Sequence, residues 1–338
     1  MTASTAAAPA LTRTRSMPLT GVIAGLIASA TFGSSGIAAR PLLDAGWTPG
    51  AIVLLRIGIP AILLLPVSGW MMRGRWPILR ERAGIVALFG VFGIAAAQVC
   101  YFNAVQYLSI GVALLMEYSG ILLVVAWHWL RTRLRPANAT LVGAAIAVVG
   151  LTLILDVFGA ASVSVPGILW GLGAAVGLAV YFVLGARTED GLPSLVVVSA
   201  GMVVGVLVLL AVAAVGLLPI HFGSSTVTLV GVQLSWIVPV LYLSLVTSLL
   251  AYQVGIAAAK ILGSTMASFF GLTEVLFAVL IAWLLLGEKP SALQMLGGVL
   301  VLGGVVLVRV GEYGGTSRTP DDRDPADGTT IIEATPAG

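Results

Sequence analysis

The stretch WLRTRLRPANATLVGAAIAVVGLTLI, residues 129–154, decides the fold, because a related stretch recurs as WLLLGEKPSALQMLGGVLVLGGVVLV, residues 283–308. Each copy has an apolar run ending in tryptophan, a short polar turn closed by proline, and a glycine-rich apolar run. The chain is therefore predicted to consist of two related halves. At a constant offset of 154 residues the matched pairs are Trp129 and Trp283, Pro136 and Pro290, Gly143 and Gly297, and Gly150 and Gly304.

The composition indicates a membrane protein. Of 338 residues, 59% are hydrophobic and only 9% are charged, and the mean hydropathy is +1.08. A soluble domain carries about 25% charged residues, so lipid must cover much of this surface. The apolar runs are longer than the alternating segments of about ten residues in a membrane barrel. The class is therefore a polytopic, all-α membrane protein.

Several other classes of site are excluded. The single cysteine, Cys100, rules out an intrachain disulfide, and no spacing typical of metal ligands occurs. Accordingly, no cofactor and no metal are expected. The pI near 9.2 does not imply nucleic acid, because the basic residues fall in short loops between apolar runs.

Ten apolar runs are each long enough for the roughly 20 residues that a bilayer requires. The first run could be read as a signal peptide, because residues 28–30 resemble a cleavage site. It continues apolar past that site, which favours a membrane span. Residues 1–18 and 311–338 are predicted to be disordered. The predicted spans are 19–39, 50–71, 83–107, 110–130, 138–156, 166–187, 193–219, 233–257, 262–286 and 291–310.

The distribution of positive charge predicts the orientation. Fourteen of the 17 Lys and Arg residues fall in the N-terminus, the even-numbered loops and the C-terminal end. The odd-numbered loops hold only Arg40 and Lys289, and Arg56 lies within a span. Cytoplasmic loops carry the excess of positive charge. Both termini are therefore predicted to lie in the cytoplasm, with the chain in the plasma membrane.

The repeat and the orientation together predict an inverted architecture. Each half, 19–157 and 166–310, holds five spans, so the second half begins on the opposite side of the membrane from the first. The turn at residues 131–136 would then be cytoplasmic, and its counterpart at 287–290 would face outward. Inverted repeats of this kind are the architecture of secondary transporters, with the binding site near the midplane between the halves. A duplication retained only for folding is the alternative.

The second copy carries a set of motifs by which the chain resembles the EamA-type branch of the drug/metabolite transporter superfamily. This resemblance implies ten transmembrane helices in two inverted five-helix repeats and transport of small metabolites, amino acids or drugs, mostly by export or exchange. The chain departs from the family at Tyr118-Ser119-Gly120, where many members have a proline-containing segment. The motifs are Ala251-Tyr252, Gly263-Ser264-Thr265-Met266-Ala267, Glu274, the segment 282–290, the glycines from Gly297 to Gly304, and a weaker first copy at residues 111–118.

Two acidic residues, Glu117 and Glu274, lie well inside apolar spans. A charge at the centre of a spanning helix costs about 2.5–3.5 kcal/mol on insertion scales, so such residues usually face the bundle interior or a wet cavity. At the 154-residue offset Glu274 falls on Gly120, nearly one helical turn from Glu117. We expect both to face one cavity at slightly different depths, where they could bind protons or a cationic substrate. Alternatively, they are neutral groups hydrogen-bonded to neighbouring helices.

Other polar side chains within the spans are candidates for substrate binding. Arg56, about seven residues from the outer end of its span, could snorkel to the interface, form a salt bridge or bind an anion. The remaining candidates suit a mid-membrane cavity, although interhelical hydrogen bonds would explain them equally well. The glycine-rich run at residues 33–36 could be a hinge, an unwound segment or a passive bend. The remaining candidates are Gln98, Tyr101, Asn103, Tyr181, Tyr252 and Gln253.

The sequence therefore predicts a secondary active transporter that exports a small metabolite, amino acid or drug-like compound by alternating access. The expected partners are that small molecule, the lipid bilayer and, as a candidate coupling ion, protons; the oligomeric state is not predicted. The alternative is a non-transporting membrane sensor or assembly protein. An intramembrane enzyme is disfavoured, because no catalytic set occurs at matched depth.

Overall fold

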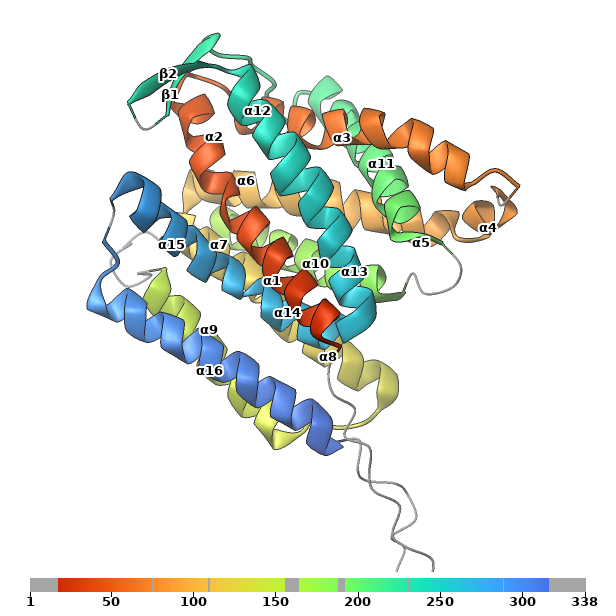
Figure 1. Ribbon diagram of the computed structural model, residues 1–338, viewed down its shortest axis with the longest axis vertical. Coiled ribbons are helices and arrows are strands. Elements are labelled where there is room, and N and C mark those ends of the chain that lie inside the picture. The colour runs from red at the N-terminus through yellow and green to blue at the C-terminus, as the bar shows by residue number, and fades with distance from the viewer. Residues whose placement is uncertain are drawn as a thin grey trace, which may run out of the picture.

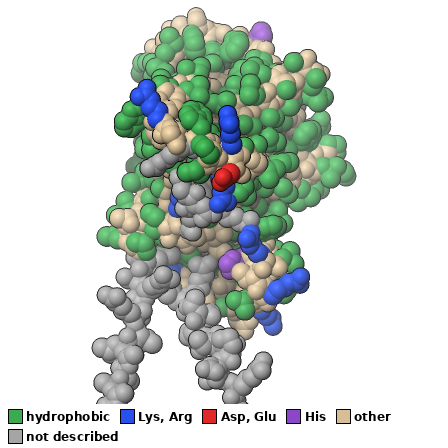
Figure 2. Space-filling view, turned by 90° about the vertical axis from the view of Figure 1, so that its right-hand side faces the viewer, with side chains coloured by type: hydrophobic (Ala, Val, Ile, Leu, Met, Phe, Trp, Pro, Cys, Tyr) green, Lys and Arg blue, Asp and Glu red, His purple; other side chains and the backbone are tan. Residues whose placement is uncertain are grey.

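The computed structural model is a bundle of helices, and it describes residues 18–74, 76–108, 110–155, 164–187, 192–229, 231–287 and 289–315 (Figure 1). Within these residues, nine helical spans are long and apolar enough to cross a membrane. The predicted fifth span corresponds to a shorter apolar helix, Asn138–Ile154. Hydrophobic side chains cover most of the face drawn in Figure 2, as expected for a surface in contact with lipid.

The first half of the chain contains nine α-helices and a π-helical segment, Phe89–Ala96, within the described residues. The predicted first span is broken at Ser34 into two helices, and the second of these continues to Asp44, beyond the predicted end at residue 39. The predicted fourth span is likewise broken, at Ser119. The helices are α1 (Leu19–Gly33), α2 (Ser35–Asp44), α3 (Pro49–Met71), α4 (Trp76–Glu81), α5 (Ala83–Leu88), α6 (Ala97–Tyr107), α7 (Ile110–Tyr118), α8 (Gly120–Thr132) and α9 (Asn138–Ile154).

The second half repeats several of these irregularities. A π-helical segment, Leu245–Leu250, again interrupts the third span of the half, and a break at Leu272 again interrupts the fourth. Its helices and strands are α10 (Val165–Arg187), α11 (Ser194–Ala214), β1 (Thr226–Leu229), β2 (Val232–Ser235), α12 (Ile237–Ser244), α13 (Ala251–Leu262), α14 (Ser264–Gly271), α15 (Thr273–Leu286) and α16 (Ala292–Gly315).

Four predicted boundaries of the second half are wrong. Helix α11 ends at Ala214 rather than at residue 219. The eighth span runs from Ile237 to Leu262 rather than from 233 to 257. The apolar residues before Ile237 form an antiparallel hairpin of β1 and β2, in which Val227 is buried against the turn between α2 and α3. Helix α16 continues to Gly315, past the predicted boundary at 310. The rest of the predicted tail, and residues 1–17, lie outside the described residues.

The two tryptophan-to-proline turns share one backbone conformation. Helix α8 ends at Arg133 and helix α15 at Gly287, and both residues are left-handed, with φ of 58° and 71°. In each turn the cap N–H donates to the carbonyl of the tryptophan, at 2.8 Å in the first and 3.1 Å in the second. A left-handed residue at this position is a common helix stop. The repeat in sequence is therefore a repeat in local structure.

Helices α9 and α16 pack along one another through the repeated glycines (Figure 1). A Cβ added at Gly143 would lie 2.7 Å from the carbonyl oxygen of Gly304, and one added at Gly150 would lie 2.6 Å from that of Gly297. In the repeat, Gly143 corresponds to Gly297 and Gly150 to Gly304. Gly143 therefore contacts the counterpart of Gly150, and Gly150 contacts the counterpart of Gly143. This reciprocity is the mark of a two-fold, self-complementary contact, and small residues allow the close approach.

Candidate functional site

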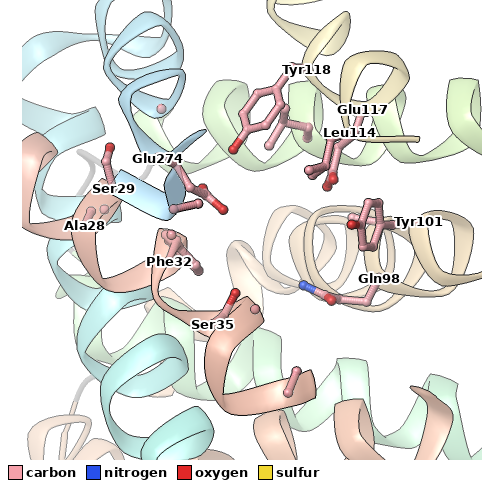
Figure 3. Close-up of a pocket in the computed structure, with 18 of the residues that line it drawn as sticks. Ala28, Ser29, Phe32, Ser35, Gln98, Tyr101, Leu114, Glu117, Tyr118 and Glu274 are labelled. Atoms are coloured by element: carbon pink, nitrogen blue, oxygen red, sulfur yellow. The ribbon is translucent and has the colours of Figure 1, made fainter. Parts of the chain in front are cut away.

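A central cavity of about 820 Å³ lies between the two halves. It is lined by residues of α1, α2, α3, α6, α7, α10, α13, α14 and α15, and by one residue of the π-helical segment Phe89–Ala96. Its walls are mostly apolar, with a few polar and charged side chains directed inward (Figure 3). A concave, largely apolar space with convergent polar groups is the usual form of a small-molecule site.

Glu117 and Glu274 both line this cavity, and their carboxyl groups point into it from α7 and α15 (Figure 3). Glu117 precedes the break at Ser119, whereas Glu274 follows the break at Leu272. Helix α7 enters its break from the end of the molecule that carries the β-hairpin, and α15 leaves its break toward that end (Figure 1). At the 154-residue offset the two glutamates differ in position by three residues. This difference places both carboxyl groups on the hairpin side of the two breaks.

Arg56 is buried in α3, with 9% of its surface exposed, and it also lines the cavity. Its Nε donates to the hydroxyl of Ser248 at 3.0 Å, and its Nη2 donates to the carbonyl of Thr247 at 3.2 Å. Both partners belong to the π-helical segment Leu245–Leu250. The interpretation that Arg56 snorkels to the interface is therefore wrong, because hydrogen bonds from a neighbouring span hold its guanidinium in the interior.

Aromatic rings form the end of the cavity that lies away from the hairpin. The ring of Tyr181 packs edge-on against Tyr252, with ring centroids 5.5 Å apart, and against Phe182 at 5.0 Å. Phe32 of α1 packs edge-on against Tyr252 at 5.2 Å. The Tyr181 hydroxyl is buried and has no hydrogen-bond partner among the residues that the structure describes. A buried hydroxyl without a partner costs free energy.

The cavity is sealed beyond these rings by close contacts between helices. A Cβ added at Gly21 would lie 2.7 Å from Ile261 Cγ2, and one added at Gly271 would lie 3.0 Å from Phe182 Cζ. These glycines bring α1 against α13, and α14 against α10. The Ser29 hydroxyl donates to the carbonyl of Phe270 at 2.9 Å and adds a further link between α1 and α14.

The opposite end of the cavity, toward the hairpin, is open. There the lining includes the exposed residues Arg40, Leu43 and Asp44 of α2. A Cβ added at Gly36 of the same helix would meet no described heavy atom within 4 Å. The Tyr242 hydroxyl of α12 donates to the Ser34 hydroxyl at 2.8 Å, which attaches the break between α1 and α2 to the eighth span.

The structure brings seven of the nine predicted site residues to the cavity and leaves two away from it. Asn103 is absent from the lining, and its side-chain amide donates to the carbonyl of Val99 in its own helix at 2.8 Å. Gln253 is also absent from the lining. Helical periodicity explains both, because neither residue shares the face of the adjacent tyrosine. Those at the cavity are Arg56, Gln98, Tyr101, Glu117, Tyr181, Tyr252 and Glu274.

Sequence reasoning missed Tyr118 and Phe32 as wall residues. Tyr118 lies four residues after Leu114, which also lines the cavity, so these two residues lie on one face of α7. Its hydroxyl points toward the carboxyl group of Glu274 (Figure 3). The spacing from Leu114 could have identified it. Phe32 was missed because only polar side chains were considered as wall residues, although it lies three residues after Ser29, which also lines the cavity.

Comparison with known proteins assigns the chain to a family. Residues 19–156 and 165–310 each match the model of the EamA-like transporter family. The chain belongs to this family. The two matched segments coincide with the two halves inferred from the repeat, to within one residue at each boundary.

Curated relatives of this family member carry transporter names. An uncharacterized inner membrane transporter, YicL, of Salmonella typhimurium is 25% identical over 294 residues, which cover 85% of this chain and 94% of the relative. An uncharacterized transporter, YdfC, of Bacillus subtilis is 28% identical over 265 residues, covering 77% and 81%. A solved crystal structure shares the fold, with a TM-score of 0.66 and 19% identity over 86% of this chain and 97% of that chain. The family and the names of these relatives indicate a membrane transporter rather than an enzyme.

Proposed function

We propose that the protein is a secondary active transporter that exports a small metabolite, amino acid or drug-like compound by alternating access. The observation that carries this proposal is the central cavity. Its interior holds the carboxyl groups of Glu117 and Glu274 and the guanidinium of Arg56, and it opens at one end, beside Arg40 and Asp44, and is sealed at the other. A carrier needs such a site, accessible from one side at a time.

The proposed architecture is ten spans in two inverted repeats of five. Its support is the reciprocal glycine contact between α9 and α16, together with the matching caps at Arg133 and Gly287. A two-fold axis that relates two antiparallel spanning helices must lie in the plane of the membrane. The packing of α1 on α13 and α15 also has a counterpart in the packing of α10 on α6 and on α7–α8.

The proposed orientation has both termini in the cytoplasm of a cell with an inner or plasma membrane. Its support is that Arg73, Arg80, Arg131, Arg135 and Lys260 lie in or near the α3–α5, α8–α9 and α13–α14 connections, at the sealed end away from the hairpin. Cytoplasmic loops carry such an excess of Lys and Arg. The cavity of this conformer would then open to the outside, where an exported compound leaves.

Cargo and direction are tested by comparing the metabolites in the medium of cells with and without the gene. An exporter enriches its cargo in the medium of the strain that carries the gene. A compound that instead disappears faster from that medium would identify an importer. Medium that is identical in both strains over a wide panel, together with no flux in liposomes, would favour the alternative of a non-transporting sensor or assembly protein.

Proton coupling is the further part of the proposal, and it rests on the two cavity carboxyl groups. The test is flux of the identified cargo, driven by a pH gradient, in proteoliposomes that contain Glu117→Gln or Glu274→Gln. Each substitution keeps size and hydrogen-bonding capacity but removes the titrating group. We expect each to lower flux strongly, whereas Glu81→Gln on the exposed helix α4 should not. Undiminished, still pH-dependent flux in both cavity variants would overturn the coupling.

A further inference from the structure

A second cavity, of about 220 Å³, lies behind the central one, between α7–α8, α9 and the α14–α15 break. Its walls include Leu122, Ala144, Val148, Leu151 and Phe269. Among its lining residues only Ser119 and Tyr118 carry polar side-chain atoms. The Ser119 hydroxyl is already engaged, because it donates to the carbonyl of Met116 in its own helix at 2.6 Å. The cavity thus offers water almost no hydrogen bond, and apolar cavities of this kind stay dry.

This cavity opens toward the membrane-facing surface. Leu122, at its edge, is 42% exposed, and Val148 is half-buried. Both residues lie near the middle of their spans, one turn past the break in the case of Leu122 and six residues from the end of α9 in the case of Val148. At that depth in a bilayer the surrounding medium is hydrocarbon. A molecule that enters from this side must therefore be apolar and already dissolved in the membrane.

The space is specific to one half of the molecule. At the 154-residue offset Ala144 corresponds to Gly298, and Leu122 corresponds to Leu276. In the second half these counterparts are packed directly, since a Cβ added at Gly298 would lie 3.2 Å from Leu276 Cδ2. In the first half the same two positions face each other across the cavity. The gap between α8 and α9 is therefore not a feature that both halves inherit from the repeat.

We propose that this second cavity binds one acyl chain of a membrane lipid, inserted between α8 and α9 against the break at Ser119. Close-packed interiors leave few voids larger than a water molecule, and an acyl chain from the adjacent leaflet is the occupant that the opening admits. Tyr118 lines both cavities, and its hydroxyl points toward Glu274 (Figure 3). The bound chain therefore supports, from behind, a side chain that forms the wall of the central cavity. The inference does not depend on proton coupling or on the identity of the cargo.

The test uses the full chain in nanodiscs of a phospholipid that carries a diazirine at the middle of one acyl chain. After irradiation, cross-linked peptides are identified by mass spectrometry. We expect cross-links within residues 115–122 and 144–151, in addition to general labelling of exposed positions such as Val299. Labelling of Val299 without labelling of both cavity segments would overturn the proposal.

Matched substitutions distinguish a bound chain from the surrounding lipid. Val148→Phe places a ring in the cavity, whereas Val149→Phe places the same ring on an exposed position, 53% accessible, outside it. We expect loss of the cavity cross-links in the first variant and their retention in the second. Equal labelling of the cavity segments in both variants would show surrounding lipid only and would overturn the proposal.

A second pair guards against a variant that fails to fold. Leu122→Phe and Leu123→Phe change neighbouring residues of nearly equal exposure, 42% and 41%, and only Leu122 lines the cavity. The cross-link to the 144–151 peptide should be lost in the first and kept in the second. Thermal unfolding of each variant in the same nanodiscs shows that the protein is folded. Retention of that cross-link in folded Leu122→Phe would contradict the proposed site.

Discussion

The two ends of the central cavity are built from the same types of helix but are packed in opposite ways. At the sealed end, glycines let side chains of a neighbouring helix approach within about 3 Å of where a Cβ would lie, as at Gly21 and Gly271. At the hairpin end, Gly36 faces open space. The difference shows that glycine serves two purposes in one bundle. At the sealed end, glycine permits two helices to pack closely. At the open end, the absence of a side chain at Gly36 leaves more space at the mouth of the cavity.

The comparison predicts an all-or-none difference in chemical accessibility. In a Cys100→Ala background, Gly36→Cys should react rapidly with a membrane-impermeant maleimide added from the hairpin side. Ala259→Cys, at a position of α13 that is 0% exposed, should stay unreactive until the protein is denatured. The measurement is the fraction of protein that gains the mass of the reagent. Reaction of Gly36→Cys from the opposite side only would show that the cavity opens at the other end.

A large energetic effect is expected at Gly255, where the Tyr181 hydroxyl lies directly against the backbone. A Cβ added there would collide with that hydroxyl but would lie 3.7 Å from Tyr181 Cζ, an ordinary contact. Gly255→Ala should therefore lower the free energy of unfolding by about 1–3 kcal/mol, the range for overpacking. Thermal unfolding with a chemical-denaturant series measures the loss.

The cause of that loss is checked by a double-mutant cycle. Tyr181→Phe removes the colliding hydroxyl, and with it a buried polar group that has no partner in the described structure. Gly255→Ala combined with Tyr181→Phe should recover most of the stability lost in Gly255→Ala alone. Strictly additive losses would show that the collision is not what makes Gly255→Ala unstable.

A moderate effect is expected at the break between α1 and α2. Tyr242→Phe removes the hydrogen bond to Ser34, and a hydrogen bond of this kind contributes about 0.5–1.5 kcal/mol. The melting temperature should fall slightly, and amide hydrogen exchange should increase around residues 33–37. Tyr107→Phe, at an exposed tyrosine, is the control. Unchanged exchange at the break in Tyr242→Phe would mean that Tyr242 does not restrain it.

The smallest effect is expected at Gly36 itself. Gly36→Ala adds a methyl group to open space within a helix, so the free energy of unfolding should not fall and should rise by about 0.4–1 kcal/mol, because alanine restricts the unfolded chain. This variant is the counterpart of Gly255→Ala at the other end. A loss as large as that of Gly255→Ala would mean that the mouth closes in solution, and the contrast between the two ends would be lost.

The family, the helical membrane class and the two halves could be predicted from the sequence, because they depend on patterns that extend over many residues. The apolar runs mark helices, and the Trp129–Trp283 register marks the repeat. The helix breaks at Ser119 and Leu272 and the π-helical segments were not predicted. These features change only which backbone carbonyl accepts a hydrogen bond from each N–H. Residues that commonly form α-helices can adopt them, so the sequence carries no distinct signal for them. The glycine-rich run did indicate the break at Ser34.

The candidate site was predictable where a polar residue interrupts an apolar face, as at Glu117 and Tyr252. The misplacement of Asn103 and Gln253 follows from treating polarity alone as the signal, since each lies on a different face from the neighbouring tyrosine. The partners of Arg56 could not be predicted, because they come from a span about 190 residues away in sequence. The predicted start of the eighth span falls inside β2, because alternate residues of that strand are apolar and the strand directly precedes the apolar helix.

The position of the two acidic residues relative to the helix breaks has a consequence for the transport cycle. Suppose that the two halves exchange shapes, so that the sealed end opens and the hairpin end closes. Glu117 and Glu274 would then be separated from the new mouth by both breaks, because they lie on the hairpin side of each. The two conformers would therefore not be chemical mirror images. Solvent would meet the acidic pair directly from one face of the membrane, and only past both breaks from the other.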